Sequence, residues 1–202
     1  MTEKPLAAPK FRTAEDYIMS ERQNPSKNEF LNGRTVQRSG SNRWHNLIVS
    51  NIAIAVGSRV HSGKNELYLS SMRVRVKPNF ICYPDAVLVS GEPAFADQAS
   101  DLLLNPTVIF EVISGMTNSA DKTQKLENFL AMDSIREVVL IKEDEMRIEH
   151  YAKQNPKQWI YKIYNARDDV MALESIGCKV SLAEVYAQIK FNGAHISSAA
   201  VN

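Results

Sequence analysis

Two apolar runs that each carry a single carboxylate constrain this chain more than any other feature. The first, YPDAVLV at residues 83–89, contains Asp85, and the second, NPTVIFEVIS at 105–114, contains Glu111. The second run is almost continuously apolar over Thr107–Ile113, which predicts a strand in the centre of a sheet. A carboxylate in such a strand costs free energy unless something pairs with it. Both acids therefore need a partner.

A charged helix is predicted to follow the second run, from about residue 120 to residue 132. Its apolar residues recur on one side, and Lys122 and Lys125 lie one turn apart on one face. A strand predicted over Glu137–Ile141 completes a strand–helix–strand unit, with a right-handed crossover if the two strands are parallel. The helix would bring both lysines into the neighbourhood of the carboxylates.

The rest of the chain predicts short strands and three more helices. Thr13 caps a first helix that runs to about Arg22, and Asn32-Gly33 predicts a hairpin turn within residues 29–38. Ser181 caps a last helix predicted to reach Ile189. A long buried helix is predicted from residue 43 to residue 63, and further strands at 66–69, 72–77, 81–83, 85–89, 147–152, 159–164 and 170–173. These elements predict an α/β to α+β architecture, a mixed sheet flanked by helices.

The composition fits one soluble domain. A chain of 202 residues with 44% hydrophobic side chains is long enough for one sizeable core. We expect a single domain over residues 11–190, between a disordered tail at 1–10 and a C-terminal tail at 191–202. No run approaches the roughly 20 apolar residues of a membrane helix, and the N-terminus lacks a secretory signal. Cys82 and Cys178 lie in apolar contexts typical of buried thiols, so a cytoplasmic location is expected.

The charge is unevenly distributed along the chain. Residues 1–80 carry 13 Lys and Arg against 6 Asp and Glu, a net +7, whereas residues 81–202 carry 11 against 17, a net −6. A nucleic-acid partner would therefore meet a local basic face, with the acidic groups concentrated near a metal. Trp44, Trp159 and the tyrosines of the C-terminal half are not expected to form, together with basic residues, a platform for stacking single strands.

The two strand carboxylates suggest a site for a divalent cation. Asp85 and Glu111 at the same end of a sheet, with the backbone carbonyl of Val112, would supply the hard oxygen ligands that Mg²⁺ or Mn²⁺ prefers. Such an ion polarises a phosphoryl oxygen and activates a bound water. A nearby lysine would orient that water or balance developing charge.

The chain resembles the PD-(D/E)xK nuclease superfamily and, more closely, the Uma2-type restriction-endonuclease family abundant in cyanobacteria. The likeness covers about residues 11–189. It rests on NEFLNGR at 28–34, SGSNRWHNLIVSNIAIAV at 39–56, YPDAVLV at 83–89, NPTVIFEVIS at 105–114 and DKTQK at 121–125. It implies a restriction-endonuclease-like mixed central sheet and a metal-dependent endonuclease acting on DNA.

The resemblance also implies roles for individual residues. Asp85 and Glu111 would be the two catalytic carboxylates. The superfamily lysine ordinarily lies two residues after the second acid, where this chain has Ile113, and Lys125 on the next helix matches in its place. Lys122, one turn earlier, could also reach the water.

Two earlier residues match the family as well, and two segments depart from it. Glu29 matches an early glutamate, a further metal or water contact, and His45 matches a recurrent histidine at the start of the long helix. The loop at 114–117 reads SGMT where the family usually has Ser-Pro-Ser-Thr, and residues 135–138 read IREV in place of Pro-Glu-Tyr-Trp.

Each of these residues also has a plain structural interpretation. Asp85 after a proline can simply form a turn, and Glu111 can form a buried salt bridge, for example to Lys125. The lysines can lie on the solvated face of their helix, Glu29 on the surface, and His45 in the core.

Two functions follow from different classes. The first is a Mg²⁺-dependent endodeoxyribonuclease, homodimeric if it cuts both strands. Its candidates for contacting phosphates are Lys122, Arg34, Arg38 and Arg43. The second is a catalytically silent homodimeric scaffold that keeps the nuclease fold. The near-neutral charge favours the second, because strong DNA binders usually carry a basic surplus.

Overall fold

A computed structural model describes residues 13–38, 40–60, 64–115 and 119–191 of the chain, and the side chains of residues 119–121 are not described. The tail predicted at 1–10, and all but the first residue of the tail predicted at 191–202, lie outside these ranges.

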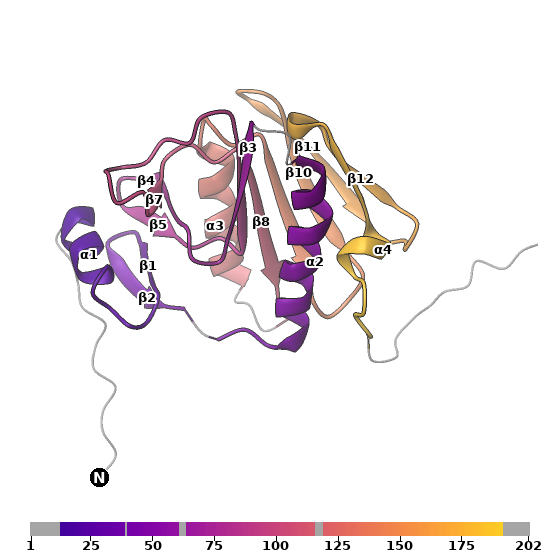
Figure 1. The fold of residues 1–202 in the computed structure, drawn as a ribbon, viewed down its shortest axis with the longest axis horizontal. Coiled ribbons are helices and arrows are strands. Elements are labelled where there is room, and N and C mark those ends of the chain that lie inside the picture. The colour runs from indigo at the N-terminus through magenta and orange to yellow at the C-terminus, as the bar shows by residue number, and fades with distance from the viewer. Residues whose placement is uncertain (1–12, 39, 61–63, 116–118, 192–202) are drawn as a thin grey trace, which may run out of the picture.

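A six-stranded mixed sheet forms the centre of the fold (Figure 1). Its parallel pair is β8 (Val108–Ile113) and β9 (Glu137–Lys142), joined by α3 (Ser119–Ala131). The strand–helix–strand unit predicted from the sequence is therefore confirmed. The other strands are antiparallel to their neighbours, in the order β11-β10-β9-β8-β6-β3. Their bounds are β3 (Asn65–Leu69), β6 (Ala86–Ser90), β10 (Ile148–Asn155) and β11 (Gln158–Tyr164).

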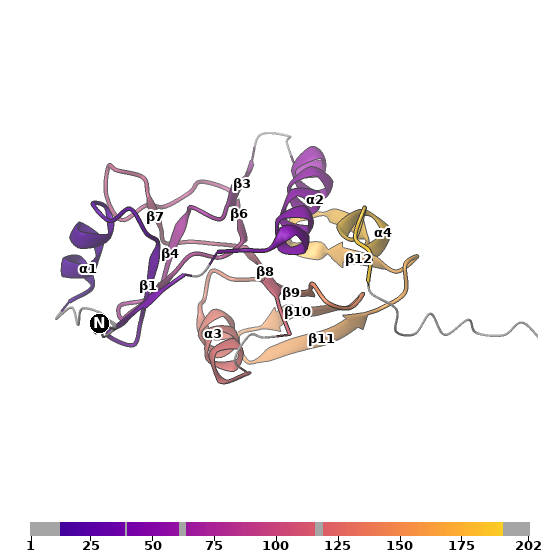
Figure 2. The ribbon, with the colours of Figure 1, turned by 90° about the horizontal axis from the view of Figure 1, so that it is seen from below.

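The sheet is covered by α3 on one face and by α2 (Arg43–Val60) on the other (Figure 2). Successive residues of a strand point to opposite faces. Accordingly Phe110 and Val112 pack in the apolar cluster beneath α2, whereas Ile109 and Ile113 pack in the cluster beneath α3. Glu111 lies between these last two in the alternation, so its side chain faces α3.

A second, five-stranded sheet packs beside the first and carries the N-terminal part of the chain. The predicted hairpin is confirmed, since Asn32 and Gly33 have φ of 52° and 79° in the left-handed region that a tight turn requires. Thr13 caps α1 by accepting the Asp16 N–H at 3.1 Å. The short strand β7 has two residues and was not among the strands predicted from the sequence. The elements are α1 (Ala14–Glu21), β1 (Asn28–Leu31), β2 (Arg34–Gln37), β4 (Arg73–Lys77), β5 (Phe80–Cys82) and β7 (Leu102–Leu103).

The C-terminal elements depart from the sequence prediction. The predicted helix to Ile189 is wrong, because α4 spans only Leu182–Val185. The Asn51 side-chain amide donates to the carbonyls of Val185 at 3.0 Å and Ala187 at 2.9 Å, and these bonds replace the next helical turn. The Ser181 capping box does form. The remaining elements are β12 (Val170–Leu173), η1 (Glu174–Ile176) and β13 (Cys178–Ser181), with β12 and β13 in a separate two-stranded sheet.

The fold is thus a mixed α+β architecture, in agreement with the prediction. Both cysteines are buried and unpaired. Within the described residues, none of the helices is long and apolar enough to cross a membrane.

Candidate active site

Asp85 and Glu111 meet at one end of the six-stranded sheet. Asp85 directly precedes β6, and Ala86 pairs with Phe110, so the same register continued by one residue sets Asp85 opposite Glu111. The Asp85 Oδ2 atom accepts the backbone N–H of Val112 at 2.8 Å. Both side chains are buried, Asp85 with 1% of its surface exposed and Glu111 with 6%. Asp85 is therefore no solvent-exposed turn residue.

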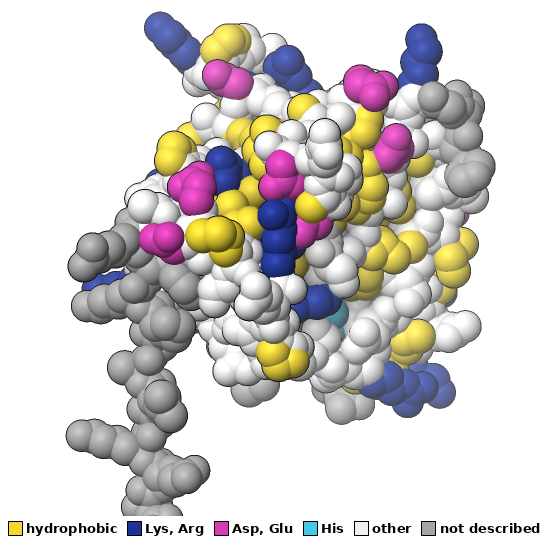
Figure 3. All heavy atoms as spheres, turned by 60° about the vertical axis from the view of Figure 1, so that its left-hand side comes forward, with side chains coloured by type: hydrophobic (Ala, Val, Ile, Leu, Met, Phe, Trp, Pro, Cys, Tyr) yellow, Lys and Arg dark blue, Asp and Glu magenta, His cyan; other side chains and the backbone are white. Residues whose placement is uncertain are grey.

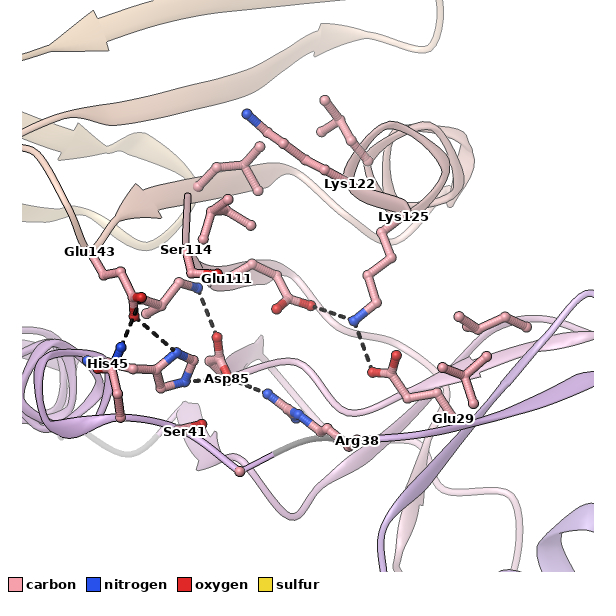
Figure 4. Close-up of a pocket in the computed structure, with 18 of the residues that line it drawn as sticks. Glu29, Arg38, Ser41, His45, Asp85, Glu111, Ser114, Lys122, Lys125 and Glu143 are labelled. Atoms are coloured by element: carbon pink, nitrogen blue, oxygen red, sulfur yellow. Dashed lines mark hydrogen bonds and ion pairs between the residues drawn. The ribbon is translucent and has the colours of Figure 1, made fainter. Parts of the chain in front are cut away.

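Two cations are drawn into this acidic cluster (Figure 4). The Lys125 ammonium, carried by α3, lies 2.9 Å from Glu29 Oε1 and 3.5 Å from Glu111 Oε1. The Arg38 guanidinium donates to Asp85 Oδ1 and to the Tyr83 carbonyl. The salt bridge between Glu111 and Lys125, which the sequence allowed as an alternative, is thus formed. Lys125 points toward the acids and not into solvent.

Glu29 joins the cluster from the five-stranded sheet. It lies on β1, is buried, and accepts the Tyr83 backbone N–H at 3.1 Å through the same Oε1 atom that contacts Lys125. Cluster residues thus come from both sheets and from α3. Glu29 is one of the polar side chains that link the two sheets.

His45 lies on the first turn of α2 and also contacts Asp85. Its Nε2 atom is 3.1 Å from Asp85 Oδ1, and its Nδ1 atom is 4.0 Å from Glu143 Oε2. The Asn42 side chain accepts the His45 backbone N–H at 3.0 Å and donates to Glu143 at 2.9 Å. The start of the helix is thereby capped, and the imidazole is held between two carboxylates.

These side chains line a cavity of about 520 Å³. On the surface, acidic, basic and histidine side chains gather around a hollow (Figure 3). The polar lining comes from β1, the segment after β2, the start of α2, the ends of β8 and β9, and α3. These residues are Glu29, Arg38, Ser41, Asn42, His45, Asp85, Glu111, Ser114, Lys122, Lys125 and Glu143.

Burial makes Glu111 a weaker acid than an ordinary glutamate. Desolvation raises the pKa of Glu111 to about 7, although the positive charge of Lys125 opposes the shift. Desolvation also acts against the charged form of Lys125, yet the carboxylates of Glu111 and Glu29 raise its pKa above the usual value. Lys125 therefore stays protonated while Glu111 titrates near neutrality.

Asp85 is shifted the other way. Burial alone would raise its pKa, but the hydrogen bond from His45, the charge of Arg38 and the Val112 N–H together lower it. The pKa of His45 is raised, because its bond to Asp85 outweighs desolvation. Asp85 is thus the permanently charged acid of the pair.

The donor set can be compared with the needs of a divalent cation. Asp85 and Glu111 offer carboxylate oxygens, and the buried Glu111 Oε1 atom makes no hydrogen bond, only the ion pair to Lys125. The N–H and C=O of one strand residue point to the same side, so the Val112 carbonyl faces the Asp85 side. These oxygens suit Mg²⁺ or Mn²⁺. However, no three His, Cys, Asp or Glu side chains of the described residues are already arranged as a metal site. Asp85 is paired with Arg38 and His45 instead.

The other residues singled out in the sequence lie farther out. Lys122 lines the cavity, but its ammonium points away to Glu149 on β10, 3.1 Å distant (Figure 4). Arg43 is exposed and stacks on the Trp44 ring at 4.7 Å. Arg34 is exposed on β2. Neither of these two arginines is among the residues that line the cavity in the described part of the chain.

Glu143 and Asn42 belong to the site and were not identified from the sequence. Glu143 directly follows β9, as Ser114 follows β8, and parallel strands bring such residues to one edge. The strand–helix–strand prediction contained this information, because it fixed which ends of β8 and β9 coincide. The loop residues 116–118, part of the segment that departs from the family, lie outside the described residues.

Comparison with known proteins identifies the family. A family model described as "Putative restriction endonuclease", Uma2, matches residues 14–183. The chain belongs to this family.

Two uncharacterized proteins of Synechocystis sp. are similar to it. The chain is 30% identical to sll1609 over 156 residues, which are 77% of this chain and 88% of that protein. It is 22% identical to slr1290 over 179 residues, 88% of this chain and 92% of that protein. A crystal structure from Anabaena variabilis, described as a putative nuclease belonging to DUF820, has a TM-score of 0.71 at 16% identity. It covers 88% of this chain and 99% of that one, and it shares the fold.

Proposed function

We propose that the protein is a Mg²⁺- or Mn²⁺-dependent endonuclease that hydrolyses DNA phosphodiester bonds. The observation that carries this proposal is the convergence of Asp85, Glu111 and Lys125 on one cavity, in a chain of this family. Two carboxylates from neighbouring strands and a lysine from the following helix are the groups that metal-assisted phosphodiester hydrolysis requires.

The metal would be held by the Asp85 and Glu111 carboxylates and the Val112 carbonyl. When bound, such an ion supplies a Lewis acid for the phosphoryl oxygen and lowers the pKa of a water. The low pKa of Asp85 keeps one ligand charged at all relevant pH values, while Glu111 becomes a full ligand as it ionises near pH 7.

Lys125 would orient the attacking water and balance charge on the phosphorane-like transition state. Its ammonium is already held between Glu29 and Glu111, so no reorganisation of α3 is needed. Glu29 fixes this lysine and contacts a second water or the metal. His45 supports Asp85 by its hydrogen bond.

Basic side chains around the cavity would bind the DNA backbone. Arg38 lies inside the cavity and Lys122 at its wall, so both are placed to contact phosphates near the cut. Arg43, at the exposed start of α2, would contact a phosphate farther along. Cutting both strands takes two such sites, which favours a homodimer.

The test is incubation with supercoiled plasmid and Mg²⁺ or Mn²⁺, beside the variants Asp85→Ala and Lys125→Ala. We expect nicking by the wild type and at least a hundredfold loss in each variant, since each removes a group used in the transition state. Nicking that survives both substitutions would remove this site from consideration. Arg167→Ala is the matched control, because that arginine is exposed and is not among the residues that line the cavity.

A second candidate is a catalytically silent scaffold with the same fold. It is favoured by one observation: Arg38 and Lys125 already pair with the three buried carboxylates, so the cluster holds together without a metal. Calorimetry with Mn²⁺ separates the two functions. A silent scaffold takes up no Mn²⁺ that depends on Asp85 and Glu111.

A further inference from the structure

Exposed apolar side chains gather on β11, the edge strand of the six-stranded sheet. Tyr161 and Ile163 have 46% and 43% of their surface exposed. Tyr161 pairs with Tyr151 of β10, and Ile163 pairs with Glu149, whose carboxylate contacts Lys122 of α3. Tyr161 and Ile163 therefore lie on the face that α3 covers in part, next to the cavity.

The aromatic rings on this face are held in place. The Tyr151 and Tyr161 ring centroids are 4.8 Å apart with the planes tilted by 34°. Tyr151 and Trp159 pack against the apolar cluster beneath α3, and the Lys153 ammonium lies 5.5 Å from the Trp159 ring. Tyr161 is thus an exposed ring supported by the half-buried rings of Tyr151 and Trp159, so little conformational entropy is lost when a ligand stacks on it.

Basic side chains flank these rings. Lys122 and Arg147 share the Glu149 carboxylate, at 3.1 Å and 3.3 Å, and Lys153 lies beyond Tyr151 along β10. Three cations thus face one carboxylate on this side of β10 and β11, which leaves a positive surplus. Lys122 also lines the cavity, and its side chain leads from there toward the strands (Figure 4). We define the aromatic strip as Lys122, Arg147, Lys153, Tyr151, Trp159 and Tyr161.

The pairing of the two strands builds this strip. Each strand carries both kinds of side chain, Tyr151 and Lys153 on β10 and Trp159 and Tyr161 on β11. The antiparallel register sets Tyr151 beside Tyr161 and Lys153 beside Trp159, so rings and cations alternate across the two strands. The face therefore has an arrangement of rings and cations that was not expected from the sequence.

We propose that the aromatic strip binds an unpaired, single-stranded segment of the nucleic acid that enters the cavity. An unpaired base offers its flat face to Tyr161, whereas in a duplex the neighbouring base pairs cover those faces. Lys122, Arg147 and Lys153 contact the phosphates of the same segment. The inference rests on the proposed nucleic-acid substrate and specifies it: DNA with a single-stranded region beside the cleaved bond.

The test measures binding alone. Fluorescence anisotropy of a labelled 15-nucleotide oligo(dT), and of a 15-base-pair duplex, is recorded with the full chain in EDTA, so that no cleavage occurs. We expect tighter binding of the single strand. Tyr161→Ala weakens it about tenfold or more, the loss of one base stacked on an aromatic ring, and Tyr161→Phe retains it.

Ile160→Ala is the matched control. Ile160 lies on the same edge strand and is 36% exposed, but it pairs with Ala152 and points to the opposite face. Equal losses in Ile160→Ala and Tyr161→Ala, or no loss in Tyr161→Ala, would overturn the proposal. So would sedimentation data in which Tyr161→Ala dissociates a dimer and leaves DNA binding intact, because a second copy would then occupy the strip. Binding that behaves as expected without any metal-dependent nicking supports the strip and contradicts only the nuclease.

Discussion

At the scale of single residues, Glu111 is the group most sensitive to pH. Its folded pKa of about 7 is above the ordinary value of 4.5, so the folded protein holds a proton that the unfolded chain has released between these two pH values. The stability that this proton provides is complete below about pH 4.5 and is lost as the pH rises through 7.

We therefore expect Glu111→Gln to gain stability relative to the wild type as the pH rises. The difference in free energy of unfolding should change by up to about 3 kcal/mol between pH 4.5 and pH 8, the equivalent of a shift of roughly 2.5 pH units. Urea unfolding at a series of pH values measures it. Glu92→Gln, at an exposed carboxylate, is the control and should follow the wild type. A pH-independent difference would show that folding does not raise the pKa of Glu111.

Arg38 pairs with Asp85, which we propose as a metal ligand. Its guanidinium binds the Oδ1 atom of Asp85 and is attracted by Glu111 and Glu29 as well, so a cation that uses Asp85 has to displace it. We expect Arg38→Gln to bind Mn²⁺ about tenfold more tightly, because removing a positive charge beside the ligands favours the ion by roughly 1–2 kcal/mol. Calorimetry measures the affinity, with Arg34→Gln as the control of equal charge. Unchanged or weaker binding by Arg38→Gln would mean that Arg38 does not occupy the metal position.

At the scale of elements, the side chain of Asn51 determines where α4 ends. It reaches from α2 to the carbonyl of Val185, the last residue of α4, and to the carbonyl of Ala187 two residues farther on. Asn51→Ala leaves both carbonyls without this donor, and we expect a loss of about 1–3 kcal/mol in the free energy of unfolding. Urea denaturation of Asn46→Ala is the comparison. The Asn46 amide also donates to two carbonyls, but on the exposed side of the same helix, so its loss should be smaller. Equal effects would contradict the role given to Asn51.

Helix α4 illustrates which features of the fold could be predicted from the sequence and which could not. Periodicity, the Ser181 capping box and the Asn32-Gly33 turn are local signals, and the helices and strands they predict are formed. The end of α4 depends on a residue more than 130 positions away, and no local pattern contains it. β13 is not among the strands predicted from the sequence, although it forms a local hairpin with β12 directly before it.

In the candidate site, too, some residues could be predicted from local sequence signals and others depend on long-range contacts. Asp85 and Glu111 stand out in sequence because they interrupt apolar runs, and Lys125 because the next helix follows directly. Glu143 and the Arg38–Asp85 pair required knowledge of which strand ends coincide. The aromatic strip required the register of β10 and β11, which the residue types alone do not fix.

At the scale of the whole molecule, the cavity joins parts of the chain that fold as separate sheets. Glu29 comes from the five-stranded sheet, Asp85 and Glu111 from the six-stranded one, and Lys125 from α3. Asp85 and Glu111 lie opposite each other only when β6 and β8 are paired, so a ligand held by both binds only to the assembled six-stranded sheet. Metal binding should therefore stabilise the whole fold rather than one loop.

We expect Mn²⁺ at about one hundred times its dissociation constant to stabilise the protein by about 2.7 kcal/mol, a rise in Tm of roughly 5–10 °C for a chain of this size. Differential scanning calorimetry measures it. Asp85→Asn should abolish the rise, because it removes the permanently charged ligand. Asp101→Asn is the matched control: it removes an aspartate that pairs with Arg22 and Arg73 outside the cavity, so it lowers the starting Tm and leaves the Mn²⁺ effect intact. A rise that persists in Asp85→Asn would place the metal elsewhere. No rise in the wild type would favour the silent scaffold, since the three buried carboxylates would then be satisfied by Arg38 and Lys125 alone.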